Sequence, residues 1–183
     1  MVLNWLKKNW GNMLLVVLFI MILIPQTGTP LKVFINRLLA FSPGIEAKDD
    51  RKILQNYNWL LRDMQGFTIN LRDYKGKKVI INFWATWCPP CIAEMPSMQA
   101  LYDDFGEETV FLFVTDDDKS PVEKFTTRHS YTFPIYQSIS QRPKALEGNT
   151  LPTTFLVDEN GSILIHKVGS ANWNSEDVRA LLE

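Results

Sequence analysis

The sequence predicts an α/β domain built in three layers, with helices on both sides of a central sheet. Three observations lead to this prediction. Short apolar runs of strand length alternate with segments of helical character, which is the order expected of a sheet covered by helices. The 183 residues leave room for one domain and an appendage. A longer apolar segment near the N-terminus stands apart from this alternation.

Residues 1–30 are predicted to form a single N-terminal signal anchor that crosses the membrane. Residues 13–24 are uninterrupted apolar sequence, and Lys7 and Lys8 precede them. This segment reaches the ~20 residues that a bilayer requires only by including its polar flanks. Residues 25–30 contain no small-residue cleavage pattern, so we expect an uncleaved anchor, with a cleaved signal peptide as the alternative. The two lysines favour an N-terminus on the inner side.

Residues 31–56 are predicted as a juxtamembrane amphipathic helix followed by a linker. Residues 42–56 are polar and contain Pro43 and Gly44, which favours a connector. The helix is expected either to lie at the membrane interface or to pack on the domain, which spans residues 57–183. Within residues 31–41 the apolar side chains recur at helical spacing and form one stripe, composed of Leu31, Phe34, Ile35, Leu38 and Phe41.

The strands of the domain are predicted from apolar runs bounded by turn residues. The first two flank Gly66 as an N-terminal β-hairpin. The last two are joined across residues 158–161, which are typical of a hairpin turn. Nearly continuous apolar runs between the hairpins are typical of buried central strands. The predicted strands comprise residues 59–64, 67–71, 79–84, 110–115, 133–136, 153–158 and 162–168.

Three helices are predicted between and after these strands. The first covers residues 92–105, and Pro96 is expected to interrupt it. The second is expected to start at a capping box in residues 120–123 (Ser-Pro-Val-Glu), with proline at the first helical position. The third runs to the C-terminus from a cap at Asn174 or Ser175.

The chain has two cysteines, Cys88 and Cys91, which lie three positions apart at the turn between a predicted strand and a predicted helix. A disulfide scaffold would need several spaced pairs, and a structural zinc site would need four ligands. His129 and His166 are isolated and share no ligand spacing with the cysteines. We therefore expect no metal site.

The position of Cys88 predicts redox chemistry. Unpaired N–H groups and the positive end of the helix dipole stabilise a thiolate at a helix N-terminus. Thiols in such C-x-x-C motifs reach pKa values between ~3.5 and ~7.5. Cys91 lies one turn inside the helix, where it can resolve a mixed disulfide formed at Cys88. Pro89 and Pro90 remove two backbone donors, so the N–H of Cys91 is expected to matter most to the thiolate.

Residues 79–96, VIINFWATWCPPCIAEMP, resemble the active-site segment of TlpA/ResA-type thioredoxin-like proteins, which are bacterial extracytoplasmic reductases and disulfide exchangers. Residues 151–156, LPTTFL, resemble the cis-proline loop of that family and the strand after it. The similarity covers residues 57–183. It implies a thioredoxin-like fold with a central mixed sheet, and a helix and strand inserted within residues 120–136. The N-terminal anchor fits the same group.

The resemblance implies a role for each residue around the motif. Cys88 is expected to be the catalytic nucleophile and Cys91 the resolving thiol. Pro152 is expected to be a cis proline that faces the pair, prevents metal capture and leaves the backbone of Leu151 free to bind an extended substrate. Trp87 is expected to shield the pair and to offer a surface to a partner.

Glu94 matches an acidic residue of the family's pattern, three positions after Cys91. Near the thiols it would raise their pKa or relay a proton to the leaving sulfur. The alternative is a solvated glutamate in the first helical turn. Asn82 stands where cytosolic thioredoxins bury an aspartate, which fits the extracytoplasmic subgroup. The acidic run at residues 116–118 is interpreted as loop solvation ahead of a helix rather than a cation site.

We therefore expect a thiol:disulfide oxidoreductase with its catalytic domain on the extracytoplasmic (periplasmic) side of a bacterial cytoplasmic membrane. The disulfide Cys88–Cys91 is expected to be its redox centre, without any other cofactor. The expected partners are protein thiol or disulfide substrates and a membrane thiol that donates electrons. The resemblance implies a reductive role, as on oxidised apocytochrome c. The net charge of −1 and the lack of a basic run speak against a nucleic-acid groove.

Two other functions are considered. A thiol peroxidase of the peroxiredoxin-related branch would place a lone reactive cysteine in a Thr-x-x-Cys setting, whereas Thr86 lies two positions before Cys88. A copper-binding assembly module would use a C-x-x-x-C motif with a distant histidine. The two-residue spacing of this motif, together with Pro152, argues against a copper module.

Overall fold

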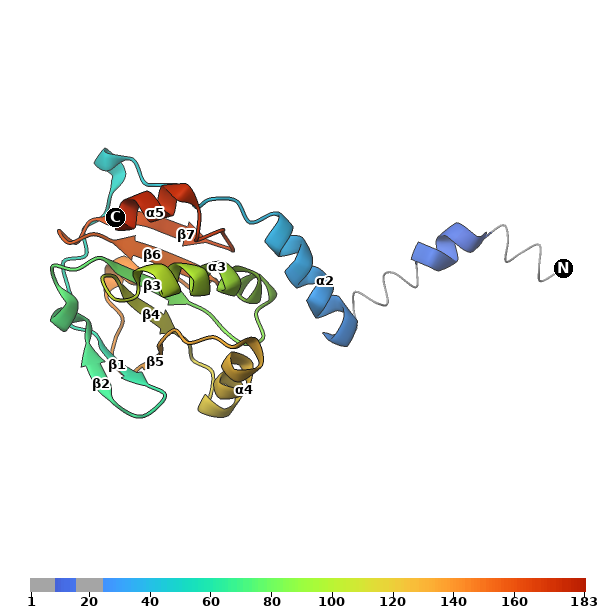
Figure 1. Cartoon of the computed structure of the whole chain (residues 1–183), viewed down its shortest axis with the longest axis horizontal. Coiled ribbons are helices and arrows are strands. Elements are labelled where there is room, and N and C mark those ends of the chain that lie inside the picture. Colours follow the sequence, from blue (N-terminus) through green and yellow to red (C-terminus); the bar gives the residue numbers. More distant parts are fainter. Residues whose placement is uncertain (1–8, 16–24) are drawn as a thin grey trace.

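Seven strands form one sheet in the computed structural model, which describes residues 9–15 and 25–183 (Figure 1). Each predicted strand is present, with ends that differ by a few residues at most. The strands are β1 (Leu60–Asp63), β2 (Thr68–Asn70), β3 (Val79–Phe83), β4 (Val110–Val114), β5 (Ile135–Ser138), β6 (Thr153–Val157) and β7 (Ile163–Val168). Residues 9–15 are helical, and the helices after them are α2 (Pro25–Leu38), α3 (Pro89–Phe105), α4 (Lys119–His129) and α5 (Glu176–Leu182).

The sheet is mixed, with strand order β2-β1-β5-β4-β3-β6-β7. Strands β3, β4 and β5 are parallel, and all other neighbours are antiparallel. Phe83, the last residue of β3, pairs with Val114 at the end of β4 and with Thr153 at the start of β6. The loops that leave β3 and β4 and the loop that enters β6 therefore meet at one edge of the sheet.

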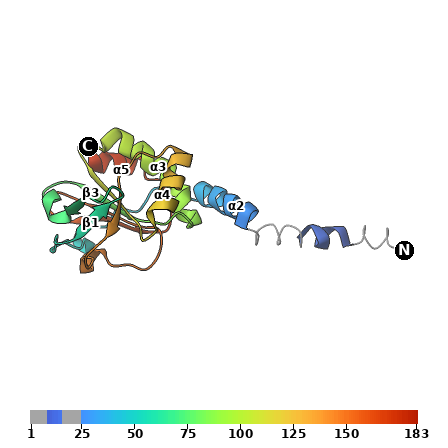
Figure 2. The ribbon, with the colours of Figure 1, turned by 90° about the horizontal axis from the view of Figure 1, so that it is seen from below.

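The helices α3, α4 and α5 lie on a single face of the sheet (Figure 2). Leu101 of α3, Val122 of α4 and Val178 of α5 belong to one buried cluster, together with Ile80 and Phe113 of the sheet. The prediction of helices on both faces is therefore wrong for this chain. Two successive crossovers, β3–α3–β4 and β4–α4–β5, proceed in the same direction across the sheet. Because such crossovers are right-handed, they place both helices on the same side.

Irregular segments cover the other face. Val79 and Ile81, which point away from α3, are buried against Leu54, Leu71 and Leu146. These three residues come from the segment before β1 and from two short 3-10 helices, Leu71–Tyr74 and Lys144–Leu146. The second core is thus built from long-range contacts of loops, which carry no periodic pattern in the sequence.

Two helix predictions need correction. Helix α3 is continuous from Pro89 to Phe105, and Pro96 lies inside it without interrupting it. A proline inside a helix costs about 3 kcal/mol, but Met95 and Met98 on either side are fully buried in the core, which offsets that cost. Helix α4 begins at Lys119 after Asp118, so residues 120–123 lie inside the helix and form no capping box.

The N-terminal helix α2 begins at Pro25, six residues before its predicted start, and ends at Leu38, before Phe41. It packs against α3, beside which it lies in both views (Figures 1 and 2). Among residues 9–15 and 25–183, no helix combines the length and the apolar character needed to cross a membrane. Most of the predicted span, residues 13–24, lies outside the described residues.

The predicted linker, residues 42–56, is attached to the domain by hydrogen bonds along its length. The N–H of Glu46 donates to the carbonyl of Leu164 (2.8 Å), and the N–H of Leu54 donates to the carbonyl of Gly161 (2.8 Å). Ile53 and Ser162 form an isolated antiparallel bridge. The packed domain therefore begins before residue 57, because this segment runs along the β6–β7 hairpin.

A substitution at Gly161 tests the packing of the segment before β1 against the β6–β7 hairpin. Gly161 has a φ of +84°, and an added Cβ would lie 2.8 Å from Tyr57 Oη and 3.2 Å from the carbonyl oxygen of Leu54. Gly169 has a similar φ of +85° with no atom near such a Cβ. Both glycine-to-alanine changes should cost about 1–2 kcal/mol of unfolding free energy from the left-handed backbone. Gly161→Ala should cost a further ~1–3 kcal/mol because of the crowding.

Urea denaturation of the full chain in detergent micelles, with Gly169→Ala as the matched control, measures both values. Equal losses for the two variants would contradict the packing of Leu54 and Tyr57 against the turn at Gly161.

Candidate active site

The loop that leaves β3 carries the two cysteines to the start of α3. Cys88 is the N-cap residue, with extended backbone angles (φ −90°, ψ 105°), and Pro89 and Pro90 occupy the first two helical positions. A residue before proline avoids helical angles, so the sequence itself ends the loop at Cys88. The N–H of Cys91 donates to Cys88 Sγ over 3.3 Å, as predicted. The two side chains are joined in a disulfide.

The disulfide is buried, whereas Trp87, which precedes Cys88 in the loop, is exposed. Cys88 has 4% of its surface exposed and Cys91 has none, whereas 70% of the Trp87 surface is exposed. An indole this exposed offers a flat apolar surface to a partner directly beside the buried sulfur pair. The predicted role of Trp87 as a contact surface for a partner stays a prediction.

The loop that enters β6 lies beside this turn. The peptide bond between Leu151 and Pro152 is cis, as predicted. The carbonyl of Pro152 accepts a hydrogen bond from the N–H of Gly169 (2.9 Å). Among the described residues, no hydrogen bond uses the backbone N–H or carbonyl of Leu151. Leu151 therefore presents the kind of unpaired backbone that an extended peptide can pair with.

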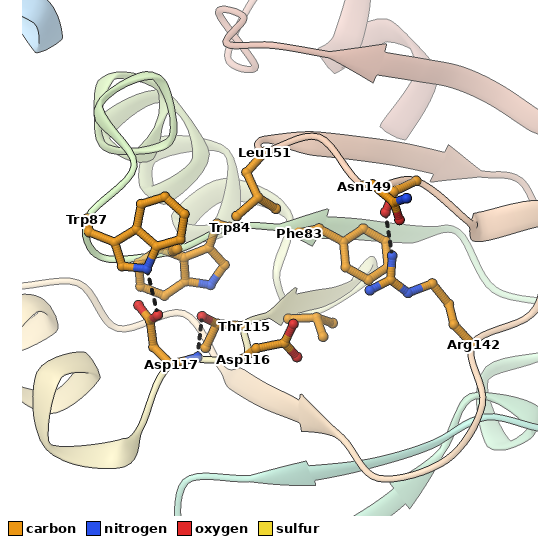
Figure 3. Close-up of a pocket in the computed structure, with 12 residues that line it drawn as sticks. Phe83, Trp84, Trp87, Thr115, Asp116, Asp117, Arg142, Asn149 and Leu151 are labelled. Carbon is orange, nitrogen blue, oxygen red and sulfur yellow. Dashed lines mark hydrogen bonds between the residues drawn. The ribbon is translucent and has the colours of Figure 1, made fainter.

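A cavity of about 310 Å³ opens between these loops, with Trp87 and Leu151 on its rim (Figure 3). At its far end the guanidinium of Arg142 lies 3.8 Å from the centre of the Phe83 ring and donates to the carbonyl of Gly148 (3.1 Å). Burial lowers the pKa of the Arg142 guanidinium from its ordinary value. The cavity thus has aromatic walls and one desolvated cation next to the disulfide loop.

Asp117 holds the loop in place, a role that the sequence did not reveal. One carboxylate oxygen accepts hydrogen bonds from the N–H and the hydroxyl of Thr86 (2.7 Å each), and the other accepts from Trp87 Nε1 (3.1 Å; Figure 3). The interpretation of residues 116–118 as loop solvation is therefore wrong for Asp117. In the sequence, only the position of Asp117 after a predicted strand could have indicated that it lies near the loop that follows β3.

Glu94 is buried on the inner side of α3, with 1% of its surface exposed. Its Oε1 accepts a hydrogen bond from Asn82 Nδ2 (2.8 Å), and its Oε2 accepts from Trp173 Nε1 (2.9 Å) and from the N–H of Ala171 (3.3 Å). Asn82 Nδ2 also donates to Thr154 Oγ1 (2.7 Å). The carboxylate therefore links α3, β3 and the loop before α5 beneath the disulfide-bearing turn.

Burial raises the pKa of Glu94 from its usual 4.5 to about 7, and the hydrogen bonds from Trp173 and Asn82 oppose this rise. The alternative of a solvated first-turn glutamate is thus wrong. At three positions after Cys91, on the same side of the helix, Glu94 is an acid that changes its charge near neutral pH. The buried Asn82, where cytosolic thioredoxins have an aspartate, donates to this acid instead of carrying a charge.

Comparison with known proteins decides the family. The sequence profile of the AhpC/TSA family matches residues 54–165. The thiol-disulfide oxidoreductase ResA of Geobacillus thermodenitrificans is 33% identical over 183 residues, which cover 97% of this chain and 98% of that protein. The chain belongs to the AhpC/TSA family, as a ResA/TlpA-type thioredoxin-like oxidoreductase.

Solved structures agree with this assignment. StoA from Bacillus subtilis is 33% identical, with a TM-score of 0.51 over 61% of this chain and 87% of StoA. A thiol:disulfide interchange protein DsbE from Chlorobium tepidum is 25% identical, with a TM-score of 0.59 over 70% of this chain and 94% of its own. The ResA/TlpA-type protein described here therefore has the thioredoxin-like fold that its motif implied.

Glu94→Gln tests the buried acid of this ResA/TlpA-type protein. The pKa of this carboxyl group is about 7 in the folded state and its usual 4.5 in the unfolded state. The folded protein therefore keeps this proton up to a higher pH than the unfolded chain does. The free energy of unfolding should therefore fall as the pH rises from 4.5 through 7, by on the order of 3 kcal/mol from this group. Because glutamine does not titrate, Glu94→Gln removes this part of the pH dependence of the unfolding free energy.

Denaturant unfolding of both proteins from pH 4 to pH 8 measures the difference, since all other titrating groups are common to them. Unfolding free energies that run parallel across this range would show that Glu94 has an ordinary pKa.

Proposed function

We propose that this oxidoreductase reduces disulfides of extracytoplasmic proteins through Cys88 and Cys91, while residues 1–30 anchor it in a bacterial cytoplasmic membrane. One observation carries the proposal. The disulfide lies at the N-terminus of α3, beside the unpaired backbone of Leu151 and the exposed ring of Trp87. A protein segment bound along Leu151 would bring its own sulfur to Cys88.

The exchange transfers two electrons in two steps. The Cys88 thiolate of the reduced protein attacks one sulfur of the substrate disulfide, which forms a mixed disulfide and releases the other substrate sulfur as a thiolate. The Cys91 thiolate then attacks Cys88 Sγ and releases the second substrate thiolate. The substrate leaves as a dithiol after taking up two protons, and the enzyme is left with the disulfide Cys88–Cys91.

Two groups assist these steps in our proposal. The N–H of Cys91 and the end of the helix dipole stabilise the Cys88 thiolate. Glu94, as its carboxylate, takes the proton of Cys91 when that thiol attacks, which its pKa of about 7 supports. A membrane dithiol then reduces the resulting disulfide, with no other cofactor required. An oxidised apocytochrome c is the substrate that the resemblance favours.

The two alternatives have less support. A thiol peroxidase of the type considered uses a lone cysteine, whereas both cysteines of this chain are paired in one disulfide. A copper module needs its thiols free and a histidine close to them. The motif has two residues between Cys88 and Cys91 and is accompanied by Pro152. Both features favour disulfide exchange over metal capture.

A trapping experiment tests the proposal. The full-length Cys91→Ser variant, reduced and in detergent, is mixed with extracytoplasmic proteins whose free thiols have been alkylated. Because only disulfides remain in that extract, capture requires attack by the Cys88 thiolate. We expect mixed disulfides that appear on non-reducing gels and disappear on treatment with a reductant.

The matched control is the double variant Cys88→Ser/Cys91→Ser, which should capture nothing. Equal recovery by both variants would contradict the exchange mechanism. Capture only from an extract with free thiols, by a protein carrying an oxidised Cys88, would contradict the reductive direction.

A further inference from the structure

Helix α2 is packed with its small and polar side chains toward the domain. Within residues 29–38, where the burial of the α2 side chains is described, Thr29, Val33 and Asn36 are partly buried, and α2 is in contact with α3. These three residues are spaced by four and three positions and share one face. A helix on the surface of a globular domain normally buries its apolar stripe and exposes its polar face. In α2 the packed face has two polar side chains and only Val33 as an apolar one, while the larger apolar side chains lie elsewhere.

The opposite face of α2 is apolar and exposed. Leu31, Phe34, Ile35 and Leu38 lie on it, and each has between 38% and 66% of its surface accessible. We call these four residues the outer stripe. Contiguous exposed apolar surface of this kind marks a site of interaction with a partner or a membrane.

The chain around the outer stripe indicates what covers it. The apolar residues 13–24 precede α2 directly, so a membrane is the nearest apolar phase along the chain. Lys32 and Arg37 are exposed and lie at the two borders between the outer stripe and the packed face. Long cations in these positions can extend to lipid headgroups while the stripe between them enters the acyl region.

We propose that α2 lies flat on the surface of an anionic lipid bilayer, with the outer stripe immersed and Lys32 and Arg37 at the headgroups. Two cations at the border favour anionic lipids. The packed face of α2, on the far side from the lipid, then supports the domain. This proposal differs from a tether alone, because it fixes the orientation of the domain as well as its distance from the membrane.

The orientation has a consequence that rests on the proposed function. The end of α3 that begins at Cys88 points toward α2 in both views (Figures 1 and 2). A docked α2 therefore holds the disulfide end of the domain close to the bilayer, where a membrane dithiol can reach it. The docking itself stands independently of the redox direction.

Nitroxide labels on the full chain test the docking. Phe34→Cys on the outer stripe and Asn36→Cys on the packed face are labelled with the native disulfide kept oxidised. The proteins are reconstituted in vesicles of phosphatidylcholine and phosphatidylglycerol. Gln65→Cys, in the turn between β1 and β2, is the exposed control. Collision rates with oxygen and with a water-soluble relaxation agent are measured for each label.

A label in lipid is open to oxygen and closed to the aqueous agent, whereas a label packed in protein is closed to both. At position 34 we expect collisions with the aqueous agent to be roughly tenfold rarer than at position 65, with undiminished oxygen collisions. At position 36 both should be reduced.

Collisions with the aqueous agent at position 34 as frequent as at position 65 would overturn the proposal. Protection from both agents, with dipolar broadening between labels on two copies, would show a dimer interface and overturn it too. The trapping reaction of Cys91→Ser does not depend on either result, so failure of the docking and failure of the exchange function are distinguishable.

Discussion

The site depends on one local constraint, the turn at which β3 gives way to α3 through Cys88. Pro89 and Pro90 cannot extend the strand pairing and are compatible with the first helical turn, while the residue before a proline must stay extended. These rules place the sulfur of Cys88 at the positive end of the helix. The N–H of Cys91 then points at it over 3.3 Å. The chemistry at Cys88 follows from that placement.

Two acidic side chains support this turn from opposite sides and in different ways. Asp117 fixes Thr86 and Trp87 through three hydrogen bonds. Glu94 lies beneath it in the core, where burial raises its pKa to about 7. Asp117 sets the geometry of the loop before Cys88, and Glu94 is the acid to which we assign the proton of Cys91 in the proposed exchange.

The sequence predicted well what is encoded locally. Buried strands such as β3 and β4 appear as apolar runs, the β6–β7 turn as a turn motif, and the redox pair as a spaced motif before a helix. It predicted less where the outcome depends on contacts between distant segments. The burial of Glu94 requires Trp173, 79 residues away, and the role of Asp117 requires Thr86, 31 residues away. The helical spacing of the apolar residues predicted the outer stripe, but nothing in the sequence predicted which face of α2 packs on the domain.

The central claim is that the N-terminus of α3 stabilises a thiolate at Cys88. A pH titration of thiolate absorbance in the Cys91→Ser variant tests it most directly, because that variant keeps the backbone N–H at position 91 and has a single thiol. The account predicts a pKa well below the ~8.5 of a free cysteine. A Cys88 that remains protonated up to or beyond that value would contradict it.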